Sequence, residues 1–109
     1  MNFLFGKKEM VPAMAEVLVD AEKIANEEMK KPRYKNYRGA EVMVDVMVRV
    51  QPANEPSFET LMKASTFKTF LLKPGVKVKV QYNQKNRKEC TLDDEVQAIL
   101  DRNPQLKKN

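Results

Sequence analysis

The strongest constraint on the fold is a run of alternating valines in the middle of the chain. Every second residue from position 42 to position 50 is valine, and the residues between them are Met43, Asp45, Met47 and Arg49. Strict alternation of β-branched residues places them on a single face of a β-strand. We therefore predict a strand that buries its valines and ends before Pro52.

A second segment, residues 57–64, alternates less strictly. The connection from the valine strand, residues 52–56, is short and holds two prolines. Short connections of this kind join antiparallel strands, so the second segment should return alongside the first. Its inward face is predicted to consist of Phe58, Thr60, Met62 and Ala64.

A third alternating segment, residues 76–82, follows a Lys-Pro-Gly turn. Its valines and Tyr82 should face inward, and its lysines and glutamine outward. A turn at residues 83–86 then leads to a short final strand at residues 89–92. Before this hairpin, a bent and buried corner is expected to include Phe67, Phe70, Leu71 and Leu72.

The segment from Met10 to Lys31 fits two interpretations. Apolar residues recur at helical spacing, and Glu, Lys and Ala are abundant, which is typical of an amphipathic helix. Small and apolar residues also alternate from Ala13 to Ala21, as they would along a strand. The pattern favours a helix, but residues 13–21 remain open between the two, and Pro32 ends the element.

The C-terminal region predicts a helix. Thr91 and Asp94 have the spacing of a capping box, and neighbouring acids favour the positive end of a helix dipole. An apolar stripe follows, and Pro104 ends the helix. We expect a flexible leader at residues 1–9, one globular domain at 10–103 and a frayed tail at 104–109.

These elements predict a mainly β fold. The chain of 109 residues is long enough for one domain with a real core. We expect a small antiparallel β-barrel, or a strongly bent sheet, with a C-terminal α-helix. The alternative is an α+β fold in which an additional N-terminal helix packs on the sheet.

The middle of the chain resembles small bacterial β-barrel modules of unknown function. The resemblance spans roughly residues 12–92 and implies a compact barrel with an unassigned binding or structural role. It also implies a first strand at about residues 13–21, and it brings no catalytic residues with it. The matching residues are Pro12 to Leu18, Val44 to Pro52, Pro56 to Glu59, Lys73 to Gly75, and Val78, Val80 and Tyr82.

Composition argues against several kinds of chemistry. The chain has no histidine, which is the most versatile general acid and base and the commonest zinc ligand. Cys90 is the only cysteine, so it has neither a disulfide partner nor a histidine base, and we expect it to be structural. We therefore predict no enzyme activity, no catalytic residues, no metal and no cofactor.

Sequence also bears on where the protein resides. No apolar run approaches the ~20 residues that a membrane-spanning helix needs. The N-terminal apolar stretch is too short for a signal peptide. A lone thiol suits a reducing compartment. The expected location is the cytoplasm.

Charge is distributed unevenly along the chain. The net charge is +5, and residues 61–88 hold eight bases and no acid. A cationic strand face on a small barrel is one way to bind single-stranded nucleic acid. The alternative is a solvated lysine face that keeps strand edges from pairing with other chains. The candidate residues for an anion or nucleic-acid face are Lys77, Lys79, Lys85, Arg87 and Lys88.

Two methionines suggest a different surface. Met43 and Met47 lie opposite the valine face of their strand. If that side is open to solvent they form an apolar patch, which often marks an interface; the alternative is that a terminal segment covers them. We predict a non-catalytic binding or assembly module that contacts another protein or itself through this face or through an edge strand. Nucleic-acid binding is the alternative function.

Overall fold

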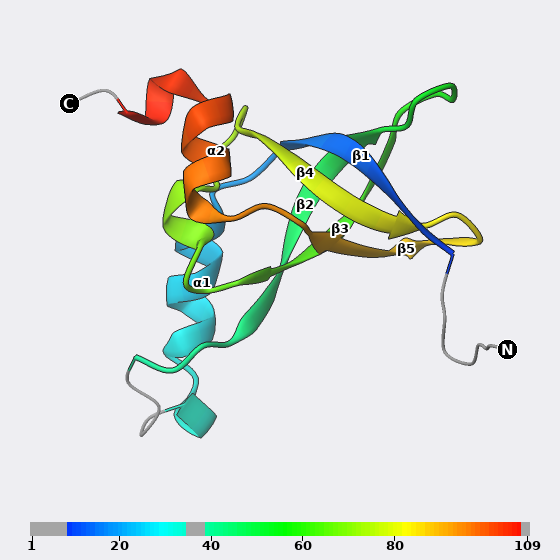
Figure 1. Ribbon diagram of the computed structural model, residues 1–109. Helices are drawn as coiled ribbons and strands as arrows, with labels where there is room; N and C mark the ends of the chain where they lie inside the picture. The colour runs from blue at the N-terminus through cyan, green and yellow to red at the C-terminus, as the bar shows by residue number, and fades with distance from the viewer. Residues whose placement is uncertain (1–8, 35–38, 108–109) are drawn as a thin grey trace, which may run out of the picture.

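The structure is a closed β-barrel with helical segments on one side (Figure 1). The computed structural model describes residues 9–34 and 39–107. Its strands are β1 (Met10–Val17), β2 (Met43–Gln51), β3 (Phe58–Ser65), β4 (Lys77–Asn83) and β5 (Asn86–Leu92). Its helices are α1 (Ala21–Met29) and α2 (Val96–Arg102), with 3₁₀ turns η1 (Pro32–Tyr34), η2 (Thr69–Leu71) and η3 (Pro104–Lys107).

Around the barrel the strand order is β1-β2-β3-β5-β4, and β4 closes back onto β1. All neighbouring strands are antiparallel except β3 and β5, which run parallel. Each of the five strands therefore has a paired neighbour on both sides, and the barrel is closed. The predicted fold class, a small β-barrel with a C-terminal helix, is confirmed.

The barrel interior is filled by the predicted alternating faces. Val46, Val48 and Val50 of β2 are completely buried, and so are Val78 and Val80 of β4. β2 and β3 pair antiparallel as expected, with Val46 opposite the buried Met62. The period-2 alternation therefore identified the core of these three strands correctly.

The N-terminal segment contains a strand and a helix in succession. β1 occupies Met10–Val17 and α1 begins at Ala21, so the interpretation as one continuous helix is wrong. The break has a local cause, because the Asp20 side chain accepts hydrogen bonds from the backbone N–H groups of Glu22 and Lys23. An aspartate in this role starts a helix. The strand interpretation holds as far as Val17.

The corner between β3 and β4 is only partly buried. Leu71 and Leu72 lie in the core, but Phe67 and Phe70 are 55% and 50% exposed, so the prediction that they are buried is wrong. Phe70 lies in the 3₁₀ turn η2, and Phe67 lies two residues before that turn. Both side chains line a hollow between η2 and α1.

The C-terminal helix is anchored by side chains rather than by the predicted capping box. α2 begins at Val96, and its N-cap residue Glu95 makes no capping side-chain bond. Asp94 instead points to β4, where its carboxylate accepts the backbone N–H of Lys79 at 2.9 Å. Asp94 also pairs with Arg102 of α2. The capping-box interpretation is therefore wrong.

Asn103 completes this anchor. Its side-chain amide is 2% exposed and accepts the backbone N–H of Lys77 at 2.8 Å. The same amide donates to the backbone carbonyls of Lys77 at 2.7 Å and of Ile99 at 2.8 Å. β5 pairs with β4 only from Val80 onward, so Asn103 and Asp94 hydrogen bond to the part of the β4 edge that β5 leaves open.

The described residues include most of the expected C-terminal tail but only the last residue of the expected N-terminal leader. Residues 1–8 of the expected leader lie outside the described residues. Of the expected tail, residues 104–107 form η3, and Leu106 packs against the core. Within the described ranges, none of the helices has the length and apolar character needed to cross a bilayer.

Candidate protein-binding face and neighbouring cavity

The outer side of the β2–β3 ribbon presents alternating apolar and charged rows. Side chains that face outward from β2 lie opposite partners on β3, because the two strands pair residue by residue. Asp45 pairs with Lys63 at 2.8 Å, and Arg49 pairs with Glu59 at 3.1 Å. The rows between and beside these pairs are Met47 with Leu61 and Met43 with Ser65.

We call Met43, Met47 and Leu61 the methionine face. Met43 is 53% exposed and Leu61 is 45% exposed, whereas Met47 is partly buried. The described residues therefore cover Met47 in part and leave Met43 open. Since the charges beside it are paired, this face is electrically neutral and partly apolar, a composition found at protein interfaces.

Four of the five predicted basic-face residues pair with acids. Lys77 lies 3.4 Å from Glu16, and Lys79 lies 3.9 Å from Asp93. Lys85 lies 3.2 Å from Glu9. Arg87 pairs with Glu55 in the β2–β3 connection. Lys88 is exposed and has no ion-pair partner among residues 9–34 and 39–107.

Lys77 belongs to a row of alternating charge that crosses four strands. Glu16 of β1 lies directly opposite Lys77 of β4 and Arg49 of β2, and Arg49 lies opposite Glu59 of β3. Glu16 and Arg49 are 3.7 Å apart. Opposite charges placed across neighbouring strands stabilise the pairing. The row sums to zero charge, so Lys77 is not part of a cationic groove.

Arg87 holds two hairpins together. Its guanidinium lies 4.4 Å from the centre of the Phe58 ring, and it pairs with Glu55 of the same hairpin. Phe58 in turn meets the Tyr82 ring edge to face, with centroids 5.2 Å apart. The β2–β3 hairpin is thus linked to the β4–β5 hairpin through Arg87, which points to a structural role for this residue.

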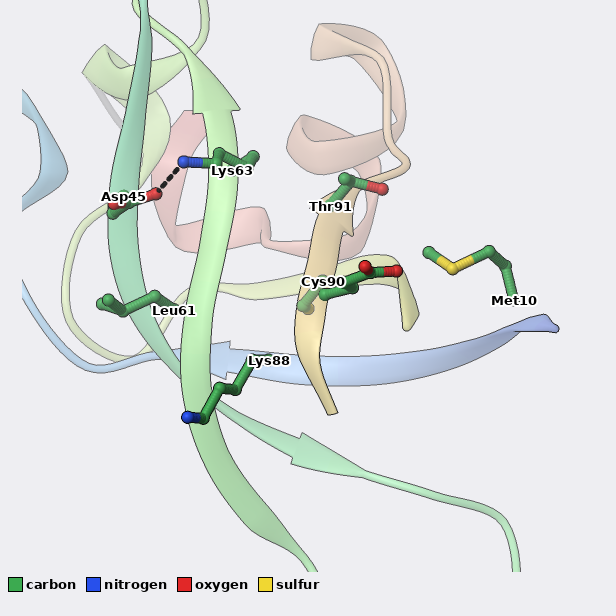
Figure 2. Close-up of a pocket in the computed structure, with 8 residues that line it drawn as sticks. Met10, Asp45, Leu61, Lys63, Lys88, Cys90 and Thr91 are labelled. Atoms are coloured by element: carbon green, nitrogen blue, oxygen red, sulfur yellow. Dashed lines mark ion pairs between the residues drawn. The ribbon is translucent and has the colours of Figure 1, made fainter. Parts of the chain in front are cut away.

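A cavity of about 400 Å³ lies where β3 and β5 meet (Figure 2). Leu61 and Lys63 approach it from β3, and the ion pair of Lys63 with Asp45 stands beside it. The cavity therefore adjoins the methionine face through Leu61. Its lining consists of Met10, Asp45, Leu61, Lys63, Lys88, Glu89, Cys90 and Thr91.

Cys90 fits the structural role predicted for it. It is buried, and burial raises the pKa of its thiol to about 11. A thiol in this state is protonated at neutral pH and is a poor nucleophile. Within the described parts of the chain, no three His, Cys, Asp or Glu side chains gather to hold a metal ion.

Sequence reasoning missed Leu61 and the cavity. Leu61 lies between two residues of the predicted inward face of residues 57–64, so it points outward. That spacing, together with the antiparallel pairing of β2 and β3, is the signal that could have identified it as the neighbour of Met47. The cavity depends on how β3 meets β5, and no local pattern reports that contact.

Comparisons with known proteins found no matching family model, no matching curated protein and no matching solved structure. The function of the chain is therefore argued from its own surface.

Proposed function

We propose that this chain is a non-catalytic module that binds another protein, or a second copy of itself, through the methionine face. The observation that supports this most directly is the exposure of Met43 and Leu61 on a ribbon whose neighbouring charges are paired. Such a surface can be buried against a partner without leaving an unpaired charge at its centre. We propose a cytoplasmic location, to which the lone thiol is suited.

Nucleic-acid binding is the second candidate, because the chain forms a small five-stranded barrel and some barrels of that size bind oligonucleotides. Fold alone does not assign function. The cations available to phosphate are few, since Lys77, Lys79, Lys85 and Arg87 already pair with carboxylates. The outer β2–β3 rows also contain no aromatic side chain on which a base could stack. We therefore rank this function below protein binding.

Site-specific photo-crosslinking in living cells tests the proposal for both kinds of protein partner. A photoreactive phenylalanine is placed at Leu61, and, as a matched control, at Met14, which is also exposed but lies on β1. We expect a discrete covalent adduct from position 61 and little or none from position 14. Equal adducts from both positions, or none from position 61, would contradict the proposal.

A further inference from the structure

The junction between β3 and β5 is the least regular contact of the barrel. One parallel bridge joins Lys63 to Thr91, and one side-chain bond runs from the Thr60 hydroxyl to the Arg87 carbonyl at 2.9 Å. The numbers of residues between these two links differ, so the strands are out of step and the cavity opens between them. The intervening residues are Leu61 and Met62 on β3, and Lys88, Glu89 and Cys90 on β5.

The cavity has the size and lining of a binding pocket. Its volume of about 400 Å³ falls within the range of roughly 300–1,000 Å³ found for ligand pockets. Met10, Leu61 and Cys90 supply apolar surface, and the methylene stems of two lysines add to it. An apolar side chain of ordinary size can therefore be received here.

The charges around the cavity leave one cation without an ion pair. Asp45 is paired with Lys63, and the Glu89 carboxylate accepts a hydrogen bond from the Asn83 amide at 2.9 Å. Lys88, at the edge of the cavity, has no ion-pair partner among the described residues. A carboxylate is the complementary group for this position.

The cavity and the methionine face form one continuous surface, because Leu61 belongs to both and the Asp45–Lys63 pair, which also lines the cavity, lies between the rows of Met43 and Met47. We propose that the partner presents an extended peptide segment along β3. One apolar side chain of the segment fills the cavity, and a neighbouring Asp or Glu pairs with Lys88. This inference rests on the proposed function, since it specifies which chemistry the partner brings to that surface.

A selection from a random peptide display library against the folded protein tests the inference. The selected peptides are measured against wild type, Leu61→Ser, Lys88→Met and the matched control Lys85→Met, whose lysine pairs with Glu9 and does not line the cavity. Lys88→Met keeps the apolar stem and removes only the charge. Amide shifts of the labelled protein then show where a selected peptide binds.

We expect selected peptides to combine an apolar residue with an Asp or Glu, and to shift amides at residues 61–63 and 88–91. Lys88→Met should weaken binding about two- to five-fold, the size of an exposed ion pair, and Lys85→Met should leave it unchanged. Leu61→Ser should weaken it more.

Peptides without acids, or binding that is equal in Lys88→Met and wild type, would overturn the inference. If such peptides shift Met43 and Met47 but not the cavity residues, the proposed function stands and the inference fails. If no peptide is enriched and position 61 gives no crosslink, both fail.

Discussion

Removing the Asn103 side chain tests how α2 is attached to the barrel. In Asn103→Ala, the backbone N–H and C=O of Lys77 lose bonds of 2.8 and 2.7 Å, and the Ile99 carbonyl loses one of 2.8 Å. The Ile99 carbonyl still accepts the backbone N–H of residue 103 at 3.0 Å. Losing the side-chain bond to Ile99 should therefore cost less free energy than losing either bond to Lys77. A net contribution of about 1 kcal/mol per bond, more where a buried group is left unpaired, predicts about 2–4 kcal/mol of destabilisation.

Urea unfolding followed by circular dichroism measures this loss as a lower midpoint, and the midpoint of thermal unfolding should fall by at least ~8 °C. The matched control is Gln97→Ala, an exposed position on the same helix, whose side chain bonds to Asp101 and to no other residue among those that the structure describes. The control should stay within about 0.5 kcal/mol of wild type. A loss of less than about 1 kcal/mol in Asn103→Ala would refute the role given to this amide.

Other variants and conditions test the remaining assignments. Arg49→Ala should cost no more than about 1 kcal/mol, less at high salt, because its ion pairs are exposed; a larger or salt-independent loss in urea unfolding would contradict this. Arg87→Ala should destabilise by about 1–2 kcal/mol, whereas an unchanged midpoint would show that its contacts with Glu55 and Phe58 contribute nothing. The Cys90 thiol, with a pKa of about 11, should react with a disulfide reagent at pH 8 only after unfolding, and rapid labelling of the folded protein would disprove its burial. Because folded Cys90 keeps a proton that the unfolded chain releases near pH 9, Cys90 should lower stability as pH rises from about 9 to 11; removing this dependence with Cys90→Ala checks the sign.

The parts of the fold that follow from local alternation were predictable. The valines of β2 and β4 face the core as expected, because side chains along a strand alternate between its two sides whatever the partner. The antiparallel return of β3 was predictable from the short connection at residues 52–56. The burial of Phe67 and Phe70 was expected from their apolar character alone, and both are exposed because they lie at the corner between β3 and β4, where no strand alternation applies.

Elements that depend on distant contacts could not be read from sequence. Asp94 has the spacing of a capping residue, but its stronger partners are the Lys79 amide and Arg102, which only the folded chain brings near. The same holds for the basic residues. Lys77 and Lys79 lie in a segment without acids, yet neighbouring strands and the β5–α2 connection supply the carboxylates. Counting charges along residues 61–88 therefore overestimated the positive charge on the outer surface of β4.

The central claim is that the methionine face, rather than the basic strands, is the binding surface. A titration of the labelled protein with a mixed-sequence single-stranded oligonucleotide, followed by amide shifts at low and near-physiological salt, tests it directly. We expect no localised shifts at Lys77, Lys79, Lys85 and Arg87 at either salt concentration, because their partners are carboxylates of the same chain. Shifts confined to residues 76–88 that weaken as salt is added would contradict it, since release of counterions from phosphate contacts produces that dependence.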